Sequence, residues 1–184
     1  MTTAGLILWS ALVLASVGAW LPIGRTAPLL SRTPVLVAVV GGEVVVTATV
    51  ALLVATGPPL HPPGSWFAVG LAGLAAVLTG GAMTLGVLGL ADVSSRPAGG
   101  RAQKVVLRGG AWIGALERIA LFATLVAGWP EGLAAIVAVK AFARYPELKT
   151  GQATGAIERF IIGTFTSLGW AAACAGVAVV LRQP

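Results

Sequence analysis

The chain has 184 residues, of which 57% are hydrophobic and only 10% are charged, and its mean hydropathy is +0.94. A soluble domain carries about 25% charged residues, and one of this size could not bury so much apolar surface. The single cysteine excludes an intrachain disulfide framework and a cysteine-rich zinc site, and the formal charge of +6 indicates anionic lipid rather than nucleic acid as the partner. We therefore expect an all-helical protein whose main partner is the lipid bilayer.

Six apolar segments follow one another, each long enough or nearly long enough to cross a bilayer, which takes about 20 helical residues. They cover residues 4–21, 34–56, 66–90, 111–129, 132–145 and 155–181. The first lacks the basic start of a signal peptide, so we expect it to be retained. The fifth is short, and we expect it to tilt or to thin the bilayer locally. The pattern predicts a single transmembrane domain over residues 1–184, a polytopic helical bundle of about six spans.

Basic residues occur in every second connection between the apolar segments, and this alternation predicts the orientation of the chain in the membrane. The connections 57–63 and 129–131 have no lysine or arginine. By the positive-inside rule, the basic connections face the cytoplasm of a cell (plasma) membrane, and both termini lie outside. Arg182, at the predicted outer end, is the exception. The basic residues of the cytoplasmic connections are Arg25, Arg32, Arg96, Arg101, Lys104, Arg108 and Lys149.

The most specific pattern is an internal repeat with an offset of 41 residues. Residues 114–118 (Gly-Ala-Leu-Glu-Arg) correspond to residues 155–159 (Gly-Ala-Ile-Glu-Arg), and Gly128-Trp129 corresponds to Gly169-Trp170. Repeats in membrane proteins often build a site where they meet. Both repeated helices are predicted to run outward, while the short fifth helix runs inward and carries Lys140 and Arg144 on one face.

Charged side chains at membrane depth cost a few kcal/mol each and are candidate functional groups. The sequence predicts a ligand-binding cluster on the cytoplasmic side, and two interpretations stay open. The cluster is either an internally neutralised network that locks the helices together, or a pocket for an anionic small molecule, a lipid headgroup or a protein partner. Glu43 is expected to be a paired structural residue rather than a proton relay. The predicted cluster comprises Glu117, Arg118, Lys140, Arg144, Glu158 and Arg159.

Three C-terminal segments resemble the C-terminal part of an uncharacterised bacterial membrane family, domain of unknown function 3307. The shared pattern is a Gly-x-Leu-Glu-Arg helix, a Lys-x-x-x-Arg helix and a Glu-x-x-x-x-Gly-Thr helix, over about the last 75 residues. The N-terminal half lacks the family's opening pattern of histidine and aspartate. The resemblance implies a multi-pass membrane protein without an established activity. The matching positions are Glu117, Arg118, Lys140, Arg144, Glu158, Gly163 and Thr164.

No residue pattern points to catalysis, a metal or a cofactor. Asp92 is the only aspartate, and neither a phosphate-binding glycine loop nor a Gly-x-Ser-x-Gly motif is present. We therefore favour a binding protein over an enzyme. The alternatives are a small transporter subunit or a lipid-modifying enzyme. Because six short helices enclose little volume, we also expect a homo-oligomer or a membrane protein partner.

Overall fold

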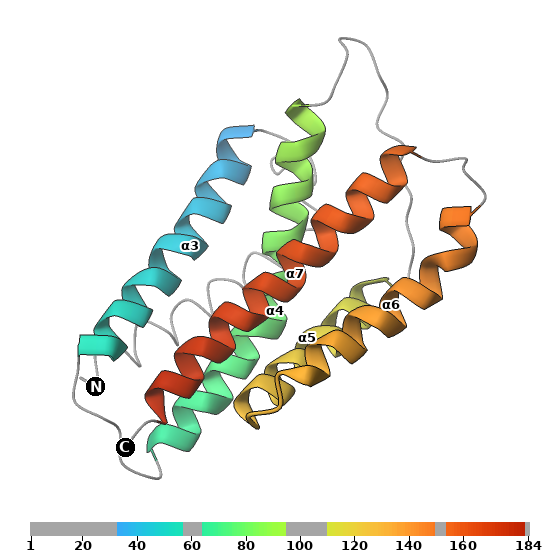
Figure 1. Cartoon of the computed structure of the whole chain (residues 1–184). Helices are drawn as coiled ribbons and strands as arrows, with labels where there is room; N and C mark the ends of the chain where they lie inside the picture. Colours follow the sequence, from blue (N-terminus) through green and yellow to red (C-terminus); the bar gives the residue numbers. More distant parts are fainter. Residues whose placement is uncertain (1–32, 57–63, 95–109, 150–153, 183–184) are drawn as a thin grey trace.

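The computed structural model describes residues 33–56, 64–94, 110–149 and 154–182, and these form five α-helices (Figure 1). The expectation of an all-helical fold is confirmed for these residues. Each helix lies on one of the predicted apolar segments, and the segment 4–21 lies outside the described residues. The helices are α3 (Thr33–Thr56), α4 (Gly64–Ser94), α5 (Gly110–Val126), α6 (Glu131–Lys149) and α7 (Thr154–Leu181).

The centre of the bundle is the pair formed by α4 and α7, which make the most extensive helix contact. The two helices are antiparallel, since Trp66 near the start of α4 lies against Arg182 just beyond the end of α7. Helix α3 packs against both members of the pair on one side, and α5 packs against both on the other side (Figure 1). Helix α6 packs mainly on α5, so it lies at the margin of the bundle.

The interior is built from small side chains and the surface from large apolar ones. Of the 17 buried hydrophobic residues among those described, eight are alanines. Large apolar side chains are exposed on every helix, including Val45 on α3, Phe67 on α4, Trp112 on α5, Phe142 on α6 and Phe165 on α7. Small residues allow helix backbones to approach closely, which is how helices associate where lipid surrounds them.

Two of the described helices are long and apolar enough to cross a membrane by length and composition. They are Gly64–Ala91 and Ile157–Leu181, and α3 contributes a shorter apolar stretch, Val40–Leu53. Helices α5 and α6 carry charged residues within shorter spans, so length and hydropathy alone do not assign them to a membrane.

Three helices end three or four residues away from the predicted boundaries, and one of them is α4, which continues to Ser94. Helix α5 ends at Val126 because Gly128 adopts a positive φ of 75°, and the amides of Gly128 and Trp129 bond back to Leu125 and Thr124 at 3.1 and 2.8 Å. These two bonds form a Schellman motif, which ends a helix at glycine. Helix α6 continues through Pro146 to Lys149, although proline removes one helical hydrogen bond. The α5–α6 connection is therefore tight, and α6 is longer than predicted.

Gly86 is a point of close contact between α4 and α3. A Cβ at this position would overlap the Cγ2 methyl of Val40, a β-branched residue with little rotamer freedom. The absence of a side chain at residue 86 therefore permits this part of the α3–α4 contact.

We predict that Gly86→Ala lowers the free energy of unfolding by about 1–3 kcal/mol, because the added methyl overpacks the α3–α4 interface. Adding Val40→Ala should recover part of the loss. Gly70→Ala is the matched control, since a Cβ there meets nothing within 4 Å. Unfolding in mild detergent measures the effect, and equal stability of the two single alanine variants would contradict the prediction.

Candidate functional site

Arg118 is a buried cation halfway along α5, with 4% of its surface exposed. Its Nη1 donates to the Ser167 hydroxyl on α7 at 3.1 Å, and its Nη2 donates to the Val77 carbonyl on α4 at 3.1 Å. One side chain therefore connects three helices. Both acceptors are neutral, so neither offsets the positive charge of the guanidinium.

Gly80 makes room for this arginine. A Cβ at residue 80 would lie 2.5 Å from the Arg118 Cδ and 3.2 Å from the Trp170 Cδ1. Beside it, the Trp170 indole Nε1 donates to the Thr79 hydroxyl at 2.5 Å, and this hydroxyl donates to the Ala75 carbonyl at 2.8 Å. The side of the bundle that faces Arg118 is thus fixed by a hydrogen bond between α4 and α7.

The Nε of Arg118 is buried and has no hydrogen-bond partner among the described residues. A buried donor without an acceptor costs about 1–3 kcal/mol. The guanidinium therefore retains an unused donor, which an anionic group could satisfy.

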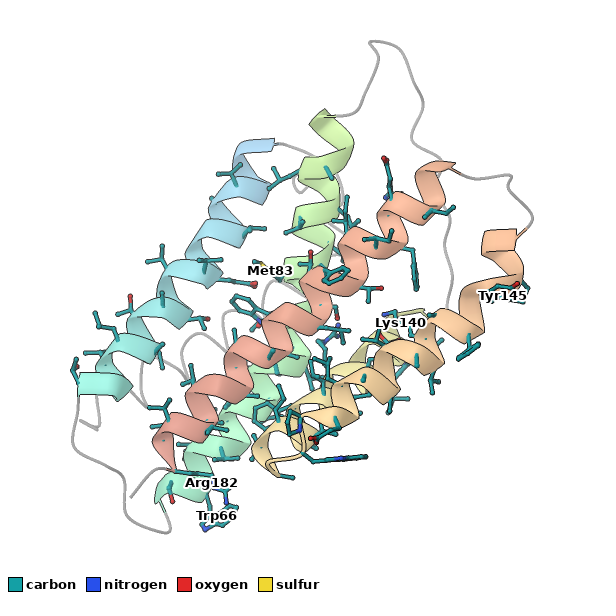
Figure 2. The ribbon with its side chains drawn as sticks, viewed as in Figure 1. Trp66, Met83, Lys140, Tyr145 and Arg182 are labelled. Atoms are coloured by element: carbon teal, nitrogen blue, oxygen red, sulfur yellow. The ribbon has the colours of Figure 1, made fainter. Side chains whose placement is uncertain are left out.

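Glu117, the neighbour of Arg118, forms an ion pair with Lys140 on α6, and both side chains are largely buried. The Lys140 ammonium also lies 5.9 Å from the centre of the Phe160 ring on α7 (Figure 2). The pair joins α6 to the rest of the bundle. Among the described residues, the Glu117 carboxylate forms its salt bridge with Lys140 and none with Arg118.

Of the other predicted site residues, the structure describes the side chains of Glu158 and Arg159 on α7. Glu158 and Arg159 are exposed near the start of α7. Arg118 lies level with Ser167, which is eight residues beyond Arg159, or about 12 Å along the helix. The two Glu-Arg sequences of the repeat therefore lie at different levels along the axis of the bundle. Arg144 belongs to α6, and its side chain lies outside the described residues.

Ser167 is the contact that the sequence analysis missed, since a serine within a helix commonly bonds its own backbone. One signal was present in the sequence. Ser167, Trp170, Ala171, Cys174 and Ala178 recur at helical spacing, and all five are buried. This spacing places Ser167 on the inward face of α7, where it can accept a hydrogen bond from another helix.

Arg182 has a structural role at the C-terminal end of α5. Its Nη1 donates to the carbonyl of Val126, the last residue of α5, at 2.9 Å, and its guanidinium lies 4.7 Å from the centre of the Trp66 ring (Figure 2). The last carbonyls of a helix lack partners within it, so this contact caps α5. Arg182 was the exception to the predicted charge bias. Its position is explained by these contacts, which join the end of α7 to the end of α5 and the start of α4.

Glu43 is the remaining buried charged residue of the described part, and it lies on α3. Its Oε2 has no hydrogen-bond partner among the described residues, and the ion pair expected from the sequence is not found there. Within the same residues, no group of three His, Cys, Asp or Glu side chains could hold a metal ion.

No family model, no curated protein and no solved structure matches this chain. The resemblance to the C-terminal part of domain of unknown function 3307 therefore stays a prediction.

We predict that Glu117→Gln and Lys140→Met each lower the free energy of unfolding by about 1–3 kcal/mol, because each leaves a largely buried charge without its partner. The double variant should lose less than the sum of the single losses. Glu131→Gln, at the exposed start of α6, is the control. Strictly additive losses in detergent unfolding would show that the pair does not couple α5 to α6.

Proposed function

We propose that the chain is a multi-pass plasma-membrane protein with six spans, whose basic connections face the cytoplasm and whose termini lie outside. The distribution of side-chain size supports this proposal. Large apolar residues cover every described helix, whereas a soluble monomer rarely exposes apolar patches larger than a few hundred Å². The aromatic ring of Trp66 beside Arg182 also fits an outer membrane–water interface.

The depth of Arg118 follows from this arrangement. Val77, which accepts its hydrogen bond, is eleven residues beyond Trp66 on α4, or about 16 Å along the helix. The hydrocarbon core is about 30 Å thick. If Trp66 lies at the outer interface, Arg118 is close to the middle of the bilayer.

We further propose that the protein binds an anionic group, a phosphate or carboxylate of a lipid headgroup or small molecule, with Arg118 as its main contact. The observation that carries this proposal is the buried guanidinium whose hydrogen-bond acceptors are both neutral. Arginine at membrane depth is costly and usually serves function, and its planar donors match phosphate and carboxylate oxygens. Glu117 acts on Arg118 electrostatically, but its salt bridge is with Lys140, so the Nε donor of Arg118 stays available for a ligand oxygen.

The route to this site would start on the cytoplasmic side. Glu158 and Arg159 are exposed at the beginning of α7, the end that carries the basic connections. Arg159 would attract an anion, and Lys140 lies further along the same route beside Phe160.

A small transporter subunit is the second candidate. Buried polar side chains occur on α3 (Glu43, Thr47), α4 (Thr79), α5 (Arg118) and α7 (Ser167), so polar groups occur on both flanks of the central pair. A transporter would move the anion across the bilayer, and uptake into liposomes distinguishes it from a binding protein.

The proposed orientation predicts opposite labelling of two connections. Leu60→Cys should react with an impermeant maleimide added to intact cells, and Gly99→Cys should react only after the cells are permeabilised. Both substitutions are made in a Cys174→Ala background, which removes the natural thiol. Labelling of residue 99 in intact cells would contradict the orientation.

The proposed site predicts that an anionic molecule co-purifies with the protein in mild detergent and is detected by native mass spectrometry. Arg118→Gln should lose this adduct, because it removes the charge and most donors, while Arg182→Gln should retain it. Circular dichroism verifies that the variants are folded, and Arg118→Lys provides a charged alternative that lacks bidentate donors and should bind weakly. An adduct that persists in Arg118→Gln would refute the site, and solvent extraction separates a lipid from a soluble anion.

A further inference from the structure

Glu43 lies on the inward face of α3. This face also carries Val40, Thr47 and Val50, which follow at helical spacing. Val50 is fully buried against residues of α4 and α7, and Val40 packs in the second apolar cluster with Met83 and Cys174. Since Glu43 is located between these contacts and is only 6% exposed, its carboxyl group points into the bundle.

No described cation compensates this carboxyl group. Glu43 is the only ionisable residue of α3, and the α4 segment Gly64–Ala91 has none. On α7, the thiol of Cys174 is the ionisable group within electrostatic reach, whereas Glu158, Arg159 and Arg182 are exposed towards the helix ends. The charged groups of α5 are directed elsewhere, because Arg118 donates to α4 and α7 and Glu117 pairs with Lys140.

An ionised carboxylate in such surroundings is strongly unfavourable, because it is only 6% exposed and has no ionic partner among the described residues. Binding a proton removes the charge and converts the group into a hydrogen-bond donor and acceptor. The Oε2 atom has no protein partner in the described part, so the group is not held in one protonation state by a fixed hydrogen bond to that oxygen.

We propose that Glu43 is a reversible proton-binding site in the interior of the bundle, next to the contacts of α3 with α4 and α7. Proton loading neutralises the face through which α3 packs, and proton release places a negative charge in that interface. The folded chain therefore holds this proton more tightly than an unfolded chain, and the packing of α3 weakens as the pH rises. This site does not depend on anion binding at Arg118, so loss of either property leaves the other standing.

Infrared spectroscopy tests the protonation state directly. The full chain in phosphatidylcholine vesicles should show the carbonyl stretch of a protonated carboxyl group at neutral pH, and Glu43→Gln should lack it. The band should disappear reversibly at alkaline pH. Its absence at neutral pH, or its persistence at every pH at which the protein stays folded, would overturn the proposal.

Carbodiimide labelling tests the same site without any substitution at Glu43. Dicyclohexylcarbodiimide is apolar and reacts with protonated carboxyl groups, so it should modify Glu43, while a water-soluble carbodiimide should modify the exposed Glu158 instead. Peptide mass spectrometry should show labelling of Glu43 falling about tenfold for each pH unit above its midpoint. Labelling that is independent of pH, or that sodium ions block at constant pH, would overturn the assignment of a proton site.

Discussion

The close packing of α4 against α7 is the contact on which the rest of the structure depends. The facing side chains are mainly alanine, threonine, serine and cysteine, and they allow the two backbones to approach. At this distance the indole of Trp170 reaches the hydroxyl of Thr79, so the pair is joined by a hydrogen bond as well as by packing. Helices α3 and α5 then use opposite flanks of this pair, and α6 is added through α5 (Figure 1).

Two arginines show how the surroundings of a side chain decide its role. Arg182 is exposed, caps the last carbonyl of α5 and lies over Trp66, so it fastens three helix ends. Arg118 is buried, and its placement requires glycine at residue 80. A neutral side chain could connect the same helices at a lower cost in free energy, because burying a charge is unfavourable unless it is paired. The retained charge is what makes Arg118 the better candidate for a ligand contact.

The two helices on either side of the α4–α7 pair carry one buried acidic and one buried basic side chain. Glu43 brings a carboxyl group from α3, and Arg118 brings a guanidinium from α5, yet their described contacts keep them apart. Arg118 is held by α4 and α7, while Glu43 faces the apolar clusters beside Val40 and Val50. Within the described residues, the bundle thus contains two buried ionisable groups that form no salt bridge, instead of the single neutral network that the formal charges would allow.

The sequence by itself determined where the helices lie, because long apolar segments leave the backbone only internal hydrogen bonds to make. It also placed a connection at residues 129–131, one residue after the turn at Gly128, and identified Glu117, Arg118 and Lys140 as charges within helices. Only the tertiary structure decided their partners: Lys140 for Glu117, Ser167 and Val77 for Arg118, and no described cation for Glu43. The physical reason is that α3 and α4 carry large or small apolar residues on every side, so hydrophobic periodicity does not reveal which face is buried. Helix rotation and register are set by close contacts such as those at Gly80 and Gly86, which exist only once the helices have packed.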